Sequence, residues 1–456
     1  MLTSIPHRAA RHLLPLLLAP LLAGCPGKAD EPDPRIAAQW AAPARCGQPA
    51  YAWREDLPLG EVLEHHPGDP MGLFEELTAE ALQKLMADSG RDLGVAPVHD
   101  VASFRLRYRT QDRGESTDAT AILALPLLSR GERATYPLMV YFHGTSGLND
   151  ACAPSAGLGD YLASMALAST GFVVVAPDYL GLRSLGEPSP ELHAYVTGEP
   201  TAITSLDSVR AARALLPRLG LGVEASEQVA FFGGSQGGHA ALFAARFAPY
   251  YAPDAAPAVV VASVAPADVV GEVVRSTEER LSATSNTAAV LAAWADWYGL
   301  DLAGVLLPPH DRDVPDWLLA NCGIGGLPGG APPAEIFTPA FLEAASAGFA
   351  GEDAWSCAVR ENSLPHLSLE ALEAFPTLFV QSESDELVHV PAERAAFDAL
   401  CEQGMTLEYL ECAGATHTQG ALDSVPLQLE FVRARLAGEP WPAERICQRS
   451  PAVDCG

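Results

Sequence analysis

Short, unbroken runs of hydrophobic residues alternate with longer helical segments over much of this chain. The runs span residues 137–142, 171–176, 228–232, 258–264, 376–381 and 406–410. Unbroken apolar runs of this length are typical of strands buried on both faces, and helical crossovers between them connect parallel neighbours. The pattern therefore predicts an α/β fold with a mainly parallel sheet that helices cover on both sides. Such sheets place their functional side chains beyond the carboxyl ends of the strands.

Segments nearer the N-terminus have a different pattern. Residues 101–110 and 119–126 alternate between hydrophobic and polar positions, which predicts antiparallel strands. Residues 73–86 have an amphipathic pattern, which predicts a helix.

The alternation of strands and helices lapses between residues 268 and 375. This segment contains a helical pattern at 287–298, a proline-rich stretch around Pro308 and a glycine-rich sequence at 323–330. Because a structureless loop of this length is implausible inside a compact domain, we predict an inserted, largely helical cap. Cys322 and Cys357 both lie in the segment, and our hypothesis is that they pair with each other.

The first 25 residues have the pattern of an export signal. Arg8 and Arg11 precede an apolar stretch that is too short to cross a bilayer, which requires about 20 residues. The sequence Leu-Ala-Gly-Cys that ends at Cys25 resembles the bacterial lipoprotein box, which implies cleavage before Cys25 and attachment of lipid to its thiol. An ordinary signal peptide is the alternative. We expect a signal peptide at 1–24, a lipidated tether at 25–45, and an exported lipoprotein anchored to a membrane at the periplasmic face or the cell surface.

Charge and cysteine content narrow the classes of partner. The chain has 28 Lys and Arg residues against 57 Asp and Glu residues and a formal net charge of -29, which argues against a nucleic-acid partner. The chain has nine cysteines. If Cys25 is lipidated, an even number remains for disulfides in an oxidising compartment, although spacing alone leaves their connectivity open. Cysteine and histidine spacing shows no zinc pattern, and we expect no metal or cofactor.

The sequence GGSQGG at 233–238 is the strongest chemical motif. It follows a predicted strand and precedes a helical segment, which is the context of the nucleophile elbow. In that turn, flanking glycines allow neighbouring backbone to pass without Cβ clashes. A glycine-rich turn that only packs tightly is the alternative, and the glycine spacing does not fit a dinucleotide-binding site. We predict that Ser235 is an exposed nucleophile.

A serine hydroxyl becomes a nucleophile when an adjacent base takes its proton and a third group orients that base. In this motif class the acid and then the histidine follow the serine along the chain. Asp385 follows the apolar run 376–381, and His417 follows the run 406–410. We therefore predict Ser235, Asp385 and His417 as a catalytic triad.

Other acids and histidines compete for these roles. Glu383 is the acid if the register of its loop differs from our assignment, and Asp178 and Asp268 also follow predicted strands. His239 lies four residues after Ser235 and is expected to pack on its helix. Four further histidines are expected to be partly exposed or satisfied by ordinary contacts: His65, His66, His193 and His389.

Acyl transfer also needs two hydrogen-bond donors for the developing oxyanion. The backbone N–H of Gln236, directly after the nucleophile, is the first. The second is expected in the loop formed by His143, Gly144 and Thr145, where Gly144 permits close approach and the Thr145 N–H is our first choice. A simple strand end at His143 is the alternative.

From Met139 to Gly420, the chain resembles the α/β-hydrolase superfamily and, more narrowly, the secretory lipase (lipase A-like) family and its bacterial esterase relatives. Besides Asp385 and His417, the resemblance is carried by VYFHGTSG at 140–147, GFVVVAPDYLGL at 171–182, HAYVTGEPTAITSLDSVRAARAL at 193–215 and GGSQGGHAALFAA at 233–245. It implies an oxyanion loop near residue 143 and a cap, here at about 268–375, that shapes the acyl site. We expect a single hydrolase domain at 46–456. The sequence departs from the family at the acid loop, where SESD lacks the usual glycine, and at Gly234, where the family often has a bulkier residue.

The expected function is that of a carboxylic-ester hydrolase, a lipase or esterase, which acts on a small-molecule or lipid ester through an acyl-enzyme. A peptidase or an acyltransferase with the same triad is the alternative within enzymes. A noncatalytic, surface-tethered binding protein on a hydrolase scaffold is a further alternative, but it predicts a missing triad member and all three are present.

Overall fold

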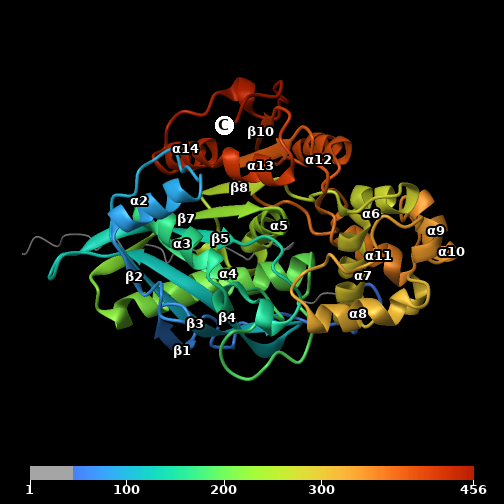
Figure 1. Ribbon diagram of the computed structural model, residues 1–456, viewed down its shortest axis with the longest axis horizontal. Coiled ribbons are helices and arrows are strands. Elements are labelled where there is room, and N and C mark those ends of the chain that lie inside the picture. The colour runs from blue at the N-terminus through green and yellow to red at the C-terminus, as the bar shows by residue number, and fades with distance from the viewer. Residues whose placement is uncertain (1–44) are drawn as a thin grey trace, which may run out of the picture.

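A computed structural model describes residues 45–456 of the chain (Figure 1). The predictions for the signal peptide at 1–24 and for Cys25 lie outside the described residues, as does the tether except for its last residue. Within residues 45–456, no helix is both long enough and apolar enough to cross a membrane.

A ten-stranded sheet with the order β1-β3-β4-β6-β5-β7-β8-β9-β10, and with β2 paired to β3, forms the centre of the described chain. Its strands are β1 (Val62–Pro67), β2 (Glu76–Leu77), β3 (Val101–Asp112), β4 (Glu115–Pro126), β5 (Ala134–Phe142), β6 (Val173–Pro177), β7 (Val223–Gly234), β8 (Val259–Ser263), β9 (Thr377–Ser382) and β10 (Leu407–Cys412). The pairs from β6 to β10 are parallel, and the pairs from β1 to β6 through β3 and β4 are antiparallel. The predicted mainly parallel sheet is confirmed, and each of the six apolar runs overlaps one strand of its parallel part.

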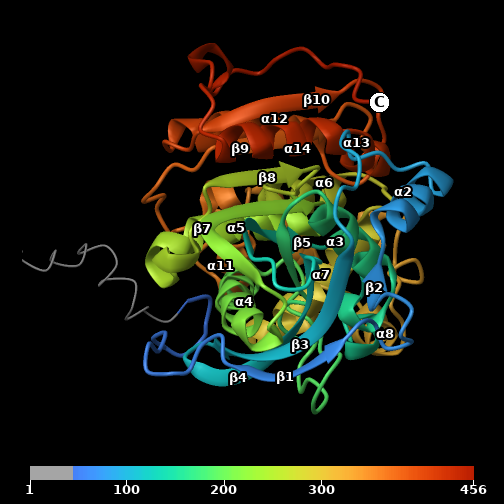
Figure 2. The ribbon, with the colours of Figure 1, turned by 90° about the vertical axis from the view of Figure 1, so that its left-hand side faces the viewer.

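Helices cover both faces of this twisted sheet (Figure 2). One face packs against α4 (Gly198–Leu219), α5 (Gln236–Tyr251) and α12 (Val390–Glu402), and the other packs against α2 (Ala79–Asp88), α3 (Gly159–Ser169) and α14 (Val425–Leu436). Phe231 of β7 joins the first core and Phe232 joins the second, because successive side chains of a strand point to opposite faces. The short helix α13 (His417–Asp423) follows β10.

The N-terminal segment differs from the prediction in where its helix starts. Helix α2 begins at Ala79 instead of residue 73, because the carboxylate of Asp69 accepts hydrogen bonds from three backbone N–H groups of the turn that follows it. The strand β2 then pairs with β3, and the Thr78 hydroxyl caps the first turn of α2. Competing local hydrogen bonds of this kind override an amphipathic pattern.

The segment between β8 and β9 folds into helices that lie beside the sheet (Figure 1). They are α6 (Val269–Glu278), α7 (Thr284–Tyr298), α8 (His310–Ala320), α9 (Pro333–Ile336), α10 (Pro339–Ser346) and α11 (Ala354–Glu361). These helices share a hydrophobic cluster that includes the fully buried Trp294 and Phe337. We call this helical unit, residues 269–361, the cap.

Our hypothesis that Cys322 pairs with Cys357 is wrong. The structure has the disulfides Cys46–Cys357, Cys152–Cys322, Cys401–Cys447 and Cys412–Cys455. Cys322 lies against the loop that follows β5, where the Asn149 side chain donates a hydrogen bond to the Leu318 carbonyl. Both cap cysteines are therefore used to attach the cap to the rest of the molecule and not to close it on itself.

Candidate active site

Ser235 lies in the sharp turn between β7 and α5. Its φ of 57° is in the left-handed region, and its backbone N–H donates to the carbonyl of Ser263 at the end of β8. A Cβ on Gly233 would lie 2.1 Å from the Gly237 carbonyl oxygen, and a Cβ on Gly237 would lie 2.0 Å from the Phe142 carbonyl oxygen. The elbow thus requires glycine at both flanking positions, and it leaves the serine on a strained backbone.

The structure brings together the three side chains predicted as a triad. His417 Nε2 lies 2.9 Å from Ser235 Oγ, and His417 Nδ1 lies 2.8 and 3.0 Å from the two Asp385 carboxylate oxygens. Because a carboxylate only accepts hydrogen bonds, Nδ1 carries the imidazole proton and Nε2 is free to accept from the serine hydroxyl. This is the tautomer that a general base for Ser235 requires.

Local structure holds the acid and the base in place. The Asp385 side chain is fully buried, and its Oδ1 also accepts the backbone N–H groups of Leu387 and Val388. His417 begins α13, which starts with a capping box between Thr416 and Gln419. Although the SESD loop lacks the glycine that is usual in the family, the Asp385 carboxylate has well-defined hydrogen-bond partners.

The competing acids have other partners. Asp178 is buried, accepts hydrogen bonds from Ser155 and Thr120, and has a pKa raised to about 6 by burial. Asp268 caps α6 by accepting from the Gly271 N–H. Glu383 accepts from the backbone N–H of Gly414, in the turn that leads to His417. These contacts give the three carboxylates roles in holding loops at the strand ends.

Among the competing histidines, His239 packs on α5 as expected. Its ring stacks on Phe243, and its Nε2 lies 3.0 Å from the Asn362 carbonyl oxygen. Burial lowers the pKa of His239 to about 4. This imidazole is neutral and belongs to the core beneath the elbow.

His193 has a more specific position than the sequence indicated. Its Nδ1 lies 2.7 Å from the Leu180 carbonyl oxygen, and its Nε2 lies 2.7 Å from Nε2 of Gln236. Burial lowers the pKa of His193 to about 3, so the ring is neutral. Nδ1 therefore donates to the carbonyl, and Nε2 accepts from the Gln236 amide, which holds the residue after the nucleophile.

The loop after β5 lies close to the elbow. A Cβ on Gly144 would lie 3.6 Å from the Gly234 carbonyl oxygen. The His143 ring is buried and stacks on Tyr179, whose hydroxyl donates to the His143 carbonyl. The Thr145 hydroxyl lies 2.8 Å from the Tyr195 hydroxyl.

Tyr179 contacts two histidines that adjoin the predicted oxyanion donors. Its ring stacks on those of His143 and His193, with centroid distances of 4.1 and 5.7 Å. The sequence placed His143 and Gln236 near the site from their motifs. Nothing local to His193 predicted its contact with Gln236, because the two residues are 43 positions apart.

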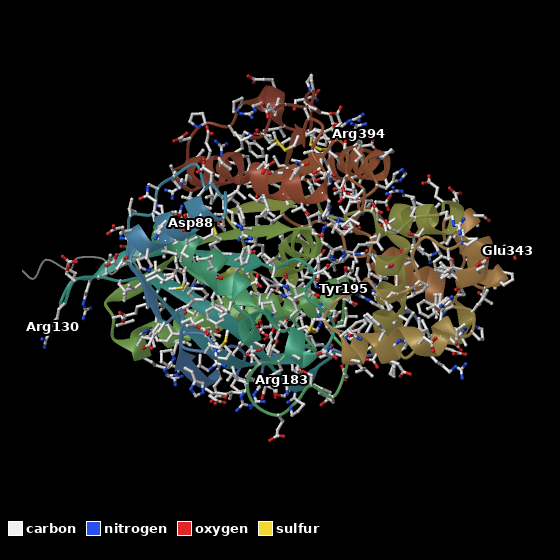
Figure 3. All side chains as sticks on the ribbon, in the orientation of Figure 1. Asp88, Arg130, Arg183, Tyr195, Glu343 and Arg394 are labelled. Carbon is white, nitrogen blue, oxygen red and sulfur yellow. A yellow bond between two sulfur atoms is a disulfide. The ribbon has the colours of Figure 1, made fainter. Side chains whose placement is uncertain are left out.

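A cavity of about 70 Å³ adjoins Ser235 and His417. The cap supplies most of its wall, through one face of α6 and the start of α7. Tyr195, which lies between the sheet region and the cap, also lines it (Figure 3). The lining is mostly apolar and includes Val269, Val273, Leu281, Val290 and Leu387, together with the charged side chains of Glu272 and Arg275.

Over residues 45–456, the structure contains no cluster of three or more His, Cys, Asp or Glu side chains suited to hold a metal ion.

Comparison with known proteins identifies the fold and class. Residues 154–306 match the secretory lipase family. The chain is similar to the ligand-bound rice cell wall degrading esterase LipA from Xanthomonas oryzae, at 20% identity and a TM-score of 0.66 over 84% of this chain and 100% of that one. A search of curated proteins found no significant match.

Two further solved structures have the same fold. A putative hydrolase from Legionella pneumophila is 20% identical, with a TM-score of 0.68 over 84% of this chain and 100% of that one. Lipase A from Candida antarctica is 15% identical, with a TM-score of 0.63 over 93% of this chain and 90% of that one. The α/β-hydrolase fold, the resemblance to secretory lipases and the predicted class of lipase or esterase are confirmed.

Proposed function

We propose that this chain hydrolyses carboxylic esters through an acyl-enzyme formed on Ser235. His417 and Asp385 are the other two members of the catalytic triad. The observation that carries the proposal is the continuous hydrogen-bonded chain from Ser235 Oγ through the His417 imidazole to the Asp385 carboxylate. Its distances match those needed for a serine activated by an adjacent base.

In the first half-reaction, Ser235 Oγ attacks the ester carbonyl carbon while His417 Nε2 takes the hydroxyl proton. Asp385 holds the ring through Nδ1 and stabilises the imidazolium that forms. The imidazolium then gives its proton to the leaving alcohol, and the carbon–oxygen bond of the ester breaks. In the second half-reaction, water loses a proton to His417 and attacks the acyl-enzyme. The bond between the acyl carbon and Ser235 Oγ then breaks, the His417 imidazolium returns its proton to Oγ, and the acid is released.

The negative charge on the carbonyl oxygen needs donors that are already in position. We assign one donor to the backbone N–H of Gln236, at the N-terminus of α5, and the other to the loop of His143, Gly144 and Thr145, with the Thr145 N–H as first choice. The closeness of Gly144 to the elbow supports this assignment. Hydrogen bonding of the Gln236 side chain to His193 supports it further, because a fixed side chain restrains its own backbone.

Labelling with a fluorophosphonate tests the nucleophile without a choice of substrate. We expect the reagent to modify Ser235 and Ser235→Ala to lose both labelling and ester turnover while keeping the melting temperature. Ser346→Ala, at an exposed position of the cap, is the matched control and should retain both activities. Full turnover in Ser235→Ala would contradict the proposal.

The same triad serves peptidases and acyltransferases, and specificity does not follow from the triad. Hydrolysis of p-nitrophenyl esters with no cleavage of aminoacyl p-nitroanilides would support the esterase assignment. Transfer to an added alcohol in preference to water would favour an acyltransferase. Absence of labelling and turnover with any ester would favour the binding protein.

We also propose that the chain is exported and anchored through a lipid on Cys25, with the hydrolase domain at 46–456 beyond the tether. Four disulfides support maturation in an oxidising compartment. Cys25→Ser should lose incorporation of radiolabelled palmitate and move the protein from the membrane fraction to the soluble fraction. Unchanged incorporation would contradict the anchor.

A further inference from the structure

The cavity beside the triad is small. At about 70 Å³, it has less than half the roughly 150 Å³ of an engineered protein cavity that holds one benzene molecule. One water molecule needs about 10–15 Å³ of such cavity volume, so the cavity has room for roughly five to seven groups of that size. A long alkyl chain does not fit within it.

Two helices of the cap, α6 and α7, form most of the wall of the cavity and contact each other. Val269, Glu272, Val273 and Ser276 line it at the spacing of one helical face of α6. The Ser276 hydroxyl lies 2.7 Å from the hydroxyl of Thr287 on α7, and both atoms are buried. This contact joins the two helices that form most of the wall of the cavity.

Glu272 places a carboxyl group in this cavity. One of its oxygens accepts the backbone N–H of His389 at 2.5 Å. Burial, with a smaller contribution from Asp268 and Asp385, raises the pKa of Glu272 to about 8. At neutral pH this carboxyl therefore keeps its proton and is a hydrogen-bond donor as well as an acceptor.

Arg275 adds a donor one helical turn further along α6. It lines the same cavity, its side chain is 14% exposed, and its Nε lies 3.8 Å from a carboxylate oxygen of Glu279. Its Nη1 is buried and has no hydrogen-bond partner in the described chain. An unpartnered guanidinium nitrogen in a substrate cavity favours a ligand that brings an oxygen acceptor.

We infer that this cavity selects esters of short acids, with about two to four carbons in the acyl chain, that carry a hydroxyl or carbonyl oxygen within reach of Glu272 and Arg275. The inference rests on the proposed function and names its substrate class. A longer alkyl chain would exceed the cavity, and the part inside it would leave the polar groups of Glu272 and Arg275 without a partner. A short chain with an oxygen substituent fills the volume and supplies the acceptor that Arg275 Nη1 lacks.

The test uses the purified protein and p-nitrophenyl esters that differ only in the acid: acetate, butyrate, 3-hydroxybutyrate, octanoate and palmitate. We expect kcat/KM to fall about tenfold or more from butyrate to octanoate. We expect it to rise about two- to tenfold from butyrate to 3-hydroxybutyrate, which is the range for one added hydrogen bond. Octanoate hydrolysis as fast as butyrate hydrolysis would overturn the inference.

A second series fixes the butyryl group and lengthens the alcohol from methyl to octyl. We expect kcat/KM to vary much less in this series, because the cavity holds the acid. A steep fall in the alcohol series together with a flat acid series would overturn the assignment of the cavity to the acid.

Arg275→Met keeps the length of the side chain and removes its charge. We expect this variant to lose the preference for 3-hydroxybutyrate and to raise octanoate turnover relative to butyrate about fourfold, which corresponds to one more buried methylene group. Arg312→Met, at an exposed position of α8 in the cap, is the matched control and should keep the wild-type profile. An unchanged profile in Arg275→Met would contradict the role of this residue.

The labelling and hydrolysis experiments distinguish a failure of this inference from a failure of the proposed function. If the fluorophosphonate does not label Ser235 and no ester is hydrolysed, the proposed function fails. If Ser235 is labelled and esters are hydrolysed without regard to acid length, only the inference fails.

Discussion

The ends of the parallel strands and the cap are built by different means, and they carry different parts of the proposed function. Ser235, Asp385 and His417 follow β7, β9 and β10, so one rigid sheet sets their spacing. The cavity wall instead comes from α6 and α7, which belong to a separate hydrophobic cluster. The difference indicates that substitutions at the strand ends will change the rate with every ester, whereas substitutions in the cap will change which ester is preferred.

The largest effect is expected at the strand ends. Asp385→Asn removes the acceptor that fixes the His417 tautomer, and we expect kcat to fall about 10⁴-fold for short and long esters alike. Asp423→Asn, an exposed position on the helix that begins with His417, is the control and should remain active. A change of acyl preference in Asp385→Asn without loss of rate would contradict the assignment of rate to the strand ends and of ester preference to the cap.

The disulfides allow the same comparison through stability. Replacing both Cys152 and Cys322 by serine detaches the cap from the loop after β5, and we expect a loss of about 2–5 kcal/mol in the free energy of unfolding. We also expect a flatter acid-length profile, measured with the p-nitrophenyl series.

The matched control replaces Cys401 and Cys447, which connect α12 to the C-terminal segment. This double variant should lose stability to a similar extent and keep the wild-type profile. Equal changes of profile in both double variants would show that general loosening, and not the cap, sets the preference.

A smaller effect is expected at His193, which acts through Gln236. His193→Ala should lower kcat about 10- to 100-fold with little change in KM, since the donor it orients acts on the transition state. Affinity for a boronic acid analogue should fall in parallel. His239→Ala also removes a buried neutral imidazole from beneath the elbow and controls for lost stability. If the two variants lose analogue affinity equally, His193 has only a packing role.

A further effect, on stability and not on rate, concerns pH and Glu272. The pKa of Glu272 is about 8 in the folded protein, above the ordinary value of 4.5. Between these two pH values, the folded protein therefore keeps a proton that the unfolded chain has released. Stability is therefore lost as pH rises from about 4.5 to 8, by at most about 1.4 kcal/mol per pH unit. Glu272→Gln should remove this loss and melt higher than the wild type at pH 8, with little difference near pH 4.5.

The control for this measurement is Glu278→Gln at an exposed position of the same helix. Its melting temperature should follow that of the wild type at both pH values. A Glu272→Gln variant that melts no higher than the wild type at pH 8 would mean that Glu272 is ionised in the folded protein.

The sequence by itself determined the parts of this protein that depend on local patterns. Six apolar runs predicted six parallel strands, and the GGSQGG turn between a strand and a helix predicted Ser235, because burial on two faces and close backbone approach each restrict residue type within a few positions. The order of Asp385 and His417 after strand ends was enough to predict them as partners of Ser235.

Only the tertiary structure decided the contacts that join distant segments. Cys322 pairs with Cys152 and not with Cys357, and Gln236 contacts His193 across 43 residues. Glu272 and Arg275 became candidates for substrate selection only when α6 was placed beside Ser235. The physical reason is that such partners are selected by the packing of whole elements, and the residue types of a single segment do not encode which other segment it will meet.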